Sequence, residues 1–208
     1  MKVIITCGPS YEPIDGMRRI TNASTGELGL MLAETMCAAG HEVTVFKGEM
    51  ATTTHSAGSA EVVLFSTNDD LLAKLQQRSA DAVFHAAALC DFRVKTTRMA
   101  DGSVSTDGKV STRAGDVTLT LTPTTKVLPA LRSIFPAALI VGWKFEIDGG
   151  RGDIVGKAVG QIAECKTDGC VVNGPAWGAG FGFVAGDSAV TGLPDRPAIC
   201  QFLANLRC

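Results

Sequence analysis

KVIITCGPSYEPIDGMRRITNASTGELG, residues 2–29, is the stretch that decides the fold. Its first part, Lys2–Thr6, is a short β-branched run that ends in Gly-Pro, which is typical of a strand buried on both faces of a parallel sheet. From Thr25 the apolar residues recur with helical spacing, with Ser24 or Thr25 available as N-cap and Gly40 as the C-terminal stop. A long loop, Cys7 to Gly29, therefore joins the first strand to the first helix.

Strands and helices alternate along most of the remaining chain. Residues 41–47 (HEVTVFK) indicate a second strand, which completes a βαβ unit with the usual right-handed crossover. The pattern predicts an α/β fold, a Rossmann-like, three-layer, doubly wound and mostly parallel sheet. The other expected elements are helices at 68–78 (with Asn68 as N-cap), 124–135 and 154–165, and strands at 81–87, 138–142 and 169–173.

Two stretches interrupt this alternation. Residues 93–115 are polar and nearly free of large apolar side chains, and so long a loop predicts a mobile flap at an active site. Residues 116–122 (DVTLTLT) alternate strictly, which indicates a strand with one polar face, and 180–192 has the pattern of a hairpin. We therefore expect an antiparallel extension of the sheet, and one domain over residues 1–208.

Composition excludes several classes of partner. The formal net charge is −2 with no run of basic residues, which argues against a nucleic-acid binder and favours a small-molecule partner. Apolar runs such as 136–143 are shorter than the roughly 18 to 20 residues that cross a bilayer, and the first residues lack a signal-peptide core. The seven cysteines and three histidines show no metal-ligand spacing. We expect a cytoplasmic protein with no membrane contact and no metal held by a protein cage.

The loops that follow strands are the places where α/β sheets bind ligands. The first loop carries glycines, hydroxyls, two arginines and Asn22 ahead of a helix N-terminus, where backbone N–H groups favour an anion, although glycine and proline also populate ordinary turns. The loop lacks the G-x-G-x-x-G fingerprint, and no acidic residue for a ribose follows the second strand. These absences weaken an NAD-binding interpretation.

Three later strand ends also carry candidate residues. The small side chains of Ala87 and Ala88 let a flat ring approach the backbone, or they only permit close packing of a helix on the sheet. Asp91 beside them suits a base, a ribose or a metal. Val141–Glu146 ends in an aromatic residue, a lysine and a carboxylate, and Asn173 ends the strand at 169–173, where asparagine is often a plain turn residue.

Taken in order, these segments resemble the phosphopantothenate-cysteine ligase (phosphopantothenoylcysteine synthetase) family, the second enzyme of coenzyme A synthesis from pantothenate. The family pattern at the N-terminus matches GPSYEPIDGMRRITNASTGELG, residues 8–29, almost throughout. The resemblance spans nearly the whole chain as a stand-alone ligase domain. Its other motifs match AALCDF at 87–92, KVST at 109–112, GWKFE at 142–146 and VN at 172–173.

The resemblance implies a ligase that joins 4′-phosphopantothenate to cysteine through an acyl-nucleotide, with Mg²⁺ and CTP or ATP as co-substrate. It implies catalytic roles for Lys109 in activation, for Asn22 in the attack by the amine, and for Arg18 as a phosphate or carboxylate clamp. The implied nucleotide-binding residues are Ala87, Ala88, Asp91, Lys109, Trp143, Lys144 and Lys166. The implied substrate-binding residues are Gly8, Ser10, Arg18, Asn22, Ser24 and Asn173. Family members are typically homodimers, so the resemblance also implies a dimer.

The chain departs from the family at several positions. Ser111 and Thr112 replace two lysines of the flap, and Ile162 stands where bacterial bifunctional members tend to carry a phosphate-binding lysine, although Lys144 can supply charge. The choice between CTP and ATP therefore stays open. The flavin-binding decarboxylase half is absent from this sequence, so we expect no FMN.

Two other functions compete with the ligase. One is a non-catalytic relative that keeps the nucleotide and phosphopantothenate pocket, which the lower charge of the flap would suit. The other is an NAD(P)-binding oxidoreductase of the short-chain type, which needs a Tyr-x-x-x-Lys pair. The sole tyrosine, Tyr11, lies in the first loop and has no such lysine, which makes the oxidoreductase the weaker alternative.

Overall fold

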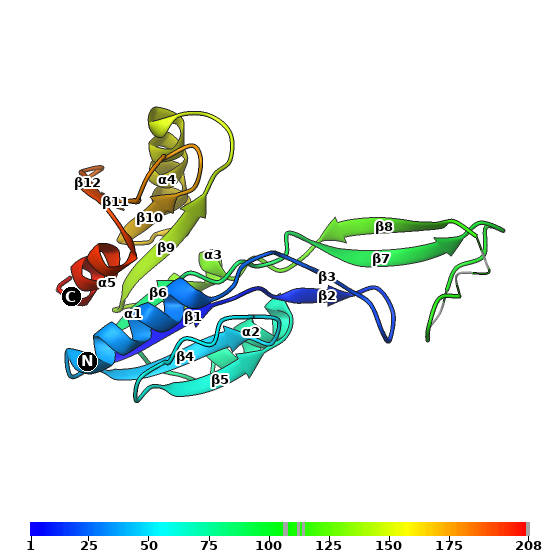
Figure 1. Cartoon of the computed structure of the whole chain (residues 1–208), viewed down its shortest axis with the longest axis horizontal. Helices are drawn as coiled ribbons and strands as arrows, with labels where there is room; N and C mark the ends of the chain where they lie inside the picture. Colours follow the sequence, from blue (N-terminus) through cyan, green and yellow to red (C-terminus); the bar gives the residue numbers. More distant parts are fainter. Residues whose placement is uncertain (106–107, 112, 114, 207–208) are drawn as a thin grey trace.

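An eight-stranded sheet forms the centre of the molecule in the computed structural model, which describes residues 1–105, 108–111, 113 and 115–206. The strand order is β12-β11-β10-β9-β6-β1-β4-β5 (Figure 1). Neighbours from β10 to β5 pair in parallel, and β11 and β12 add two antiparallel pairings. The strands are β1 (Lys2–Cys7), β4 (Glu42–Gly48), β5 (Glu61–Phe65), β6 (Ala82–His85), β9 (Leu139–Phe145), β10 (Gly169–Asn173), β11 (Phe181–Ala185) and β12 (Val190–Leu193).

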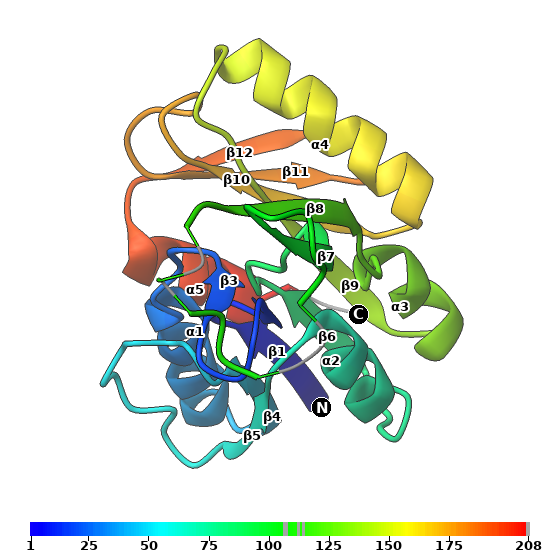
Figure 2. The same ribbon diagram turned by 90° about the vertical axis from the view of Figure 1, so that its right-hand side faces the viewer.

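Helices cover both faces of this sheet (Figures 1 and 2). Helices α1 (Glu27–Ala38) and α5 (Arg196–Ala204) pack on one face, and α2 (Asn68–Leu75), α3 (Leu128–Ile134) and α4 (Arg151–Cys165) pack on the other. Successive residues of β1 enter opposite cores, because Ile5 packs in the core of α1 whereas Ile4 packs in that of α2 and α3. The predicted three-layer, mostly parallel fold with an antiparallel extension is confirmed. No helix among the described residues has the length and apolarity to span a membrane.

Two antiparallel hairpins project from the edge of the sheet where the parallel strands end (Figure 1). One joins β2 (Tyr11–Pro13) to β3 (Arg19–Thr21) within the first loop, and the other joins β7 (Phe92–Met99) to β8 (Val117–Pro123). The expectation of an irregular flap over 93–115 was therefore wrong for its first part, which is strand β7. Most side chains of β7 are at least partly exposed, so its sequence lacks the apolar alternation that marks a strand. The β7–β8 pair forms its own sheet and does not extend the main one.

Several predicted boundaries also differ from the structure. Helix α1 follows Gly26, whose φ of 81° is left-handed, so neither Ser24 nor Thr25 is the N-cap. Thr67 caps α2 in place of Asn68, whose amide binds two distant backbone carbonyls. Helix α3 begins four residues later than expected, at Leu128. Strand β5 and helix α5 were not predicted at all.

Candidate active site

The first loop and the segment after β6 meet where the order of the strands reverses, between β1 and β6. This is the position where open α/β sheets bind ligands. The two segments are joined along their backbones, because the Ala88 N–H donates to the Gly8 oxygen (2.9 Å) and the Ser10 N–H donates to the Ala88 oxygen (3.3 Å). The predicted site segments 7–29 and 87–92 therefore form one continuous surface.

Asn22 crosses this junction. Its Nδ2 donates to the backbone oxygens of Ala88 and Leu89, each at 3.0 Å. A carbonyl oxygen only accepts hydrogen bonds, so the NH₂ end of the Asn22 amide, and not its oxygen, must face these two carbonyls. The contacts therefore fix the orientation of the side chain. Both Nδ2 hydrogens are thereby used, and the exposed side chain has only Oδ1 to offer a ligand. Asn22 can accept a hydrogen bond from an amine, but both of its N–H donors are occupied by the backbone.

Gly8 and Ser10 hold the loops in place. Gly8 has a φ of 75°, and a Cβ at this position would lie 2.7 Å from the Cβ of Ala51, so another residue would be strained and crowded. The buried Ser10 hydroxyl accepts a hydrogen bond from the Cys90 N–H at 2.8 Å. Ser24 lies half-buried in the segment before α1. In the structure Gly8 and Ser10 thus hold the two loops in position.

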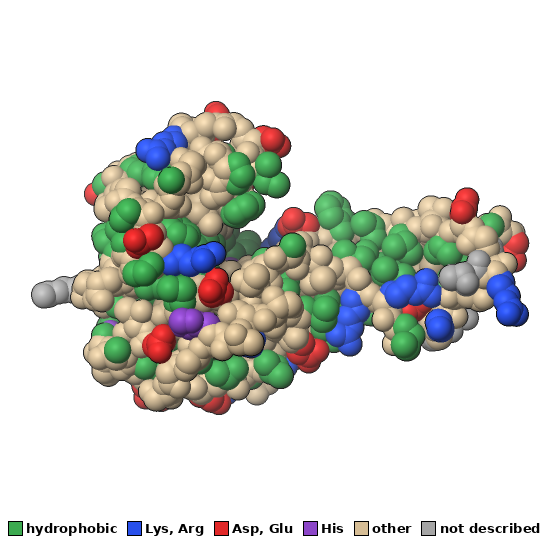
Figure 3. All heavy atoms as spheres, in the orientation of Figure 1, with side chains coloured by type: hydrophobic (Ala, Val, Ile, Leu, Met, Phe, Trp, Pro, Cys, Tyr) green, Lys and Arg blue, Asp and Glu red, His purple; other side chains and the backbone are tan. Residues whose placement is uncertain are grey.

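A cleft of about 570 Å³ opens beside this junction, on the face covered by α2, α3 and α4. Its volume is typical of a small-molecule site, which spans roughly 300 to 1,000 Å³. Figure 3 shows the surface hollowed between the lobe that carries α4 and the projecting hairpins. Four residues predicted to bind the nucleotide line the cleft, namely Ala87, Asp91, Trp143 and Lys144. The lining also includes Asn68, His85, Lys126 and Lys157, which the sequence analysis did not select.

Three lysines line this cleft, and each pairs with a carboxylate. Lys126 pairs with Asp91, and Glu146 receives both Lys157 (2.6 Å) and Lys144 (3.6 Å). The hydrogen bond from Lys157 is the main cause that holds the pKa of Glu146 below its usual range. The cleft thus offers three ammonium groups from α4, β9 and the segment before α3, an arrangement that suits the phosphates of a nucleotide.

Two buried polar residues lie at the back of the cleft. His85 Nδ1 lies 2.8 Å from Thr6 Oγ1, and burial lowers the pKa of His85 to about 4. Asn68 Nδ2 donates to the backbone oxygens of Cys90 (2.8 Å) and Thr125 (2.9 Å), while its buried Oδ1 accepts no hydrogen bond from the described residues. Sequence reasoning missed both because their partners lie far away in the chain, although His85 lies within a predicted strand.

The flap returns to the first loop at Val110. The Val110 N–H donates to Asp15 Oδ2 at 3.1 Å, and Arg18 Nη2 donates to the Val110 oxygen. Asp15 also pairs with Arg18 at 3.0 Å, and backbone N–H groups, first that of Met17, hold the pKa of Asp15 below its usual range. We call this set of contacts the flap latch. It places the exposed Lys109 next to the Arg18 loop and outside the lining of the cleft.

Three other predicted residues lie outside the cleft lining. Ala88 contributes its backbone to the junction described above. Lys166 ends α4 with a left-handed φ of 55°, and its backbone oxygen accepts from Arg132 Nε at 2.9 Å, before β10 begins. Asn173 ends β10, where its backbone oxygen accepts from the Glu146 N–H (3.2 Å) and its Oδ1 is buried without a partner among the described residues. The predicted set therefore divides between the cleft, the first loop and positions away from both.

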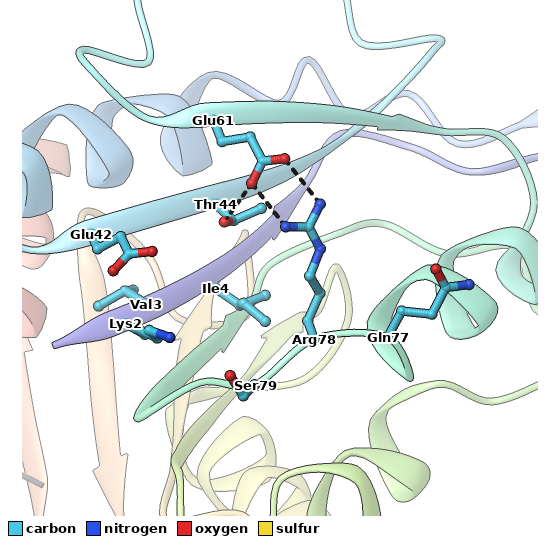
Figure 4. A pocket seen from close by; sticks show the side chains of 9 residues that line it. All are labelled: Lys2, Val3, Ile4, Glu42, Thr44, Glu61, Gln77, Arg78 and Ser79. Carbon is cyan, nitrogen blue, oxygen red and sulfur yellow. Dashed lines mark hydrogen bonds and ion pairs between the residues drawn. The ribbon is translucent and has the colours of Figure 1, made fainter.

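A second, smaller hollow lies at the opposite ends of the same strands (Figure 4). Its volume is about 190 Å³, below the range of typical ligand sites. Arg78 and Glu61 close it with two parallel hydrogen bonds of 2.9 Å each, and Thr44 donates to the same carboxylate at 3.1 Å. Arg78 and Glu61 satisfy each other and the hollow is the smaller of the two, so the larger cleft is the better candidate site.

Comparison with known families shows to which family the chain belongs. The family described as the DNA/pantothenate metabolism flavoprotein C-terminal domain matches residues 1–197. The chain belongs to this family. Among curated relatives of the domain, the coenzyme A biosynthesis bifunctional protein CoaBC of Thermococcus kodakarensis is 30% identical over 177 residues, which cover 83% of this chain and 41% of that protein. The chain spans less than half the length of these curated relatives.

Solved structures show the same fold for this domain. The DNA/pantothenate metabolism flavoprotein of Streptococcus pneumoniae superposes with a TM-score of 0.85 at 23% identity, covering 98% of this chain and 96% of that one. A Cab2 variant in complex with phosphopantothenate-cysteine superposes with a TM-score of 0.69 at 16% identity, covering 97% and 83% of the two chains. The family resemblance seen in the sequence is thus confirmed.

Proposed function

We propose that this domain joins 4′-phosphopantothenate to cysteine, using CTP or ATP and passing through an acyl-nucleotide. The main support is the position of Asn22, whose free Oδ1 stands beside a cleft lined by three lysines. A relative named for coenzyme A biosynthesis and a structural neighbour that holds phosphopantothenate-cysteine point to the same chemistry.

In the first step, an oxygen of the substrate carboxylate attacks the α-phosphorus of the nucleotide, and pyrophosphate leaves. Both reactants are anionic, so their repulsion must be offset by cations that are in place before the attack. Lys126, Lys144 and Lys157 in the cleft supply this charge from one side. Lys109, brought to the first loop by the flap latch, supplies it from the other, which assigns this step to the flap.

In the second step, the amine of cysteine attacks the acyl carbon, and the nucleoside monophosphate leaves with the electron pair of the broken bond. We assign Asn22 Oδ1 to accept a hydrogen bond from the amine and to direct its lone pair at the acyl carbon. Fixing the angle of attack before the reaction lowers the activation barrier, because the entropic cost of orienting the amine no longer falls on the reaction step. Arg18, whose side chain is 42% exposed, keeps N–H groups free to clamp the phosphate of the substrate.

Magnesium fits this site only as a partner of the nucleotide. Among residues 1–105, 108–111, 113 and 115–206, no three His, Cys, Asp or Glu side chains gather to hold a metal ion. We therefore propose that Mg²⁺ arrives bound to the triphosphate, where it neutralises part of the phosphate charge. The cleft lysines then need only to orient the phosphates.

A nucleotide-binding relative without turnover is the main alternative. The lysines of the cleft would bind a nucleotide equally well in a protein without turnover. The flap carries less positive charge than the family pattern, because Lys109 is the sole lysine of the KVST motif. An oxidoreductase fits less well, because Tyr11 donates to Glu49 (3.1 Å) and stacks under Arg19, away from the cleft.

The test is an assay of pyrophosphate release with phosphopantothenate, cysteine and either CTP or ATP, with the amide product identified by mass spectrometry. The expected result is product that requires all three substrates, with serine in place of cysteine as a matched control of the amine. Nucleotide binding without pyrophosphate release would support the non-catalytic alternative. Neither binding nor release with CTP and ATP would overturn the proposal.

A further inference from the structure

His85 is a buried histidine that the proposed chemistry does not use. It ends β6, lines the cleft, and lies beside Thr6 at the end of the adjacent strand β1. Its Nδ1 is 2.8 Å from Thr6 Oγ1, and no described group is bonded to Nε2. The ring edge that carries Nε2 is therefore the part of His85 that is left for a ligand in the cleft.

The tautomer of His85 follows from a count of hydrogen bonds around Thr6. The Thr6 side chain is fully buried, and its oxygen accepts a hydrogen bond from the Ala87 N–H at 3.3 Å. If Nδ1–H also donated to this oxygen, the hydroxyl hydrogen of Thr6 would have no acceptor, which is costly in a buried group. The hydroxyl instead donates to Nδ1, so the proton of the neutral imidazole resides on Nε2. Burial keeps the pKa of His85 at about 4, and the ring stays neutral at neutral pH.

The surroundings of His85 suit a flat ring. Ala87, Leu89, Leu128 and Trp143 supply small or apolar walls to the same cleft, whereas the lysines lie with the carboxylates. Nucleobases stack readily on aromatic side chains and carry ring nitrogens and carbonyl oxygens that accept hydrogen bonds at their edges. A neutral donor among apolar walls can recognise such an acceptor without attracting the phosphates.

We propose that the Nε2–H of His85 donates a hydrogen bond to an acceptor atom on the base of the bound nucleotide, and so makes His85 a residue that selects the base. This role rests on the proposed function, since it assumes that the cleft holds the nucleotide. Thr6 acts through His85, as the positioning residue that keeps the proton on Nε2.

Nitrogen NMR of the histidine side chains tests the first step without any ligand. We expect the resonances of His85 at neutral pH to show a protonated Nε2 and an unprotonated Nδ1. A proton on Nδ1, or a charged ring, would overturn the proposal. This measurement uses the unmodified protein, so it does not depend on the folding of any variant.

Equilibrium binding of CTP and of ATP tests the second step. We expect His85→Leu to weaken the better-bound nucleotide about fivefold to tenfold, as befits one hydrogen bond to a neutral group. His85→Gln, which keeps an N–H donor, should restore most of this affinity, and His41→Leu at the opposite edge of the sheet should leave it unchanged. Binding of the matching nucleoside triphosphate with an altered base, such as UTP or ITP, should respond less to His85→Leu.

The outcomes separate the two proposals. Equal nucleotide affinity in the wild-type protein and in a folded His85→Leu variant would overturn the role of His85 alone. An equal loss in His85→Gln and His85→Leu would contradict the role of the donor. Failure of the wild-type protein to bind either nucleotide would overturn the proposed function, and the role of His85 with it.

Discussion

The two ends of the parallel strands treat their polar side chains differently. At the amino ends, Arg78 and Glu61 satisfy each other across a small hollow. At the carboxyl ends, Asn22, Asn68 and His85 are each held through one part of the side chain and keep another atom without a partner among the described residues. Both ends are rich in polar groups, but at the carboxyl ends the described side chains that line the cleft combine an anchored part with an atom that is available to a ligand.

This contrast shows why polarity alone is a poor guide to function. A pair such as Arg78 and Glu61 has little further capacity for a ligand, because each group already has its partner. A side chain such as Asn22 is fixed by backbone carbonyls, which also fix the direction of its free atom. Held groups with free atoms are what preorganised binding requires. The following predictions test the contrast, beginning with the largest expected effect.

Asn22→Ala should have the largest effect on the reaction. Removing the orienting acceptor should lower the rate of amide formation by about 10²- to 10³-fold, comparable to the loss of one preorganised polar group. The acyl-nucleotide should accumulate, because the first step does not use Asn22. Rapid quenching followed by mass spectrometry would measure it, with Asn205→Ala, directly after helix α5, as control. Absence of the intermediate in Asn22→Ala would contradict the assignment.

His85 should make the protein sensitive to acid. Its pKa is about 4 in the folded state against 6.5 as the ordinary value, so between these pH values only the unfolded chain takes up the proton. The free energy of unfolding should therefore decrease as the pH falls through this window, by about 3 kcal/mol in total. Urea denaturation at several pH values would measure the decrease, which should be absent in His85→Leu and present in His41→Leu.

Lys109→Ala should weaken the first step. Losing one ammonium group next to an anionic transition state should lower the rate of acyl-nucleotide formation by about 10- to 100-fold. No acyl-nucleotide should then accumulate, in contrast to Asn22→Ala. Lys95→Ala, an exposed lysine on the same hairpin, is the matched control and should react normally. Normal formation of the intermediate in Lys109→Ala would remove the flap from the activation step.

Arg78→Met should have the smallest effect and sharpen the contrast at the amino ends. The side chains of this pair are 37% and 52% exposed, and ion pairs of this kind contribute about 0.2 to 1 kcal/mol to stability. We expect a loss within that range in urea denaturation and no change in nucleotide affinity or turnover. A clear loss of nucleotide binding in Arg78→Met would mean that the two ends of the strands are coupled.

The sequence predicted the parts of the site that depend on parallel strands. Ala87 and Trp143 lie 56 positions apart, yet both lie near the carboxyl ends of strands, and parallel strands bring such ends to one edge. The end of α4 at residue 165 was predicted correctly, but the pattern could not show that Lys166 adopts a left-handed conformation, binds Arg132 through its backbone oxygen and lies outside the cleft lining. The sequence also could not predict the role of His85, which depends on its contact with Thr6. Strand β7 was missed because it has no buried face that would give its sequence a period of two.

The flap latch has a consequence for how this domain can change during evolution. Its hydrogen bonds at residue 110 use the backbone N–H and oxygen, which every amino acid except proline provides. The flap can therefore keep its polar docking while the side chains around it vary, provided that Asp15 and Arg18 stay. In this chain Ser111 stands where the family pattern has a lysine, which is a change of that kind. The attachment of the flap depends on its backbone and its charge depends on its side chains, so the charge can change while the flap stays docked on the first loop.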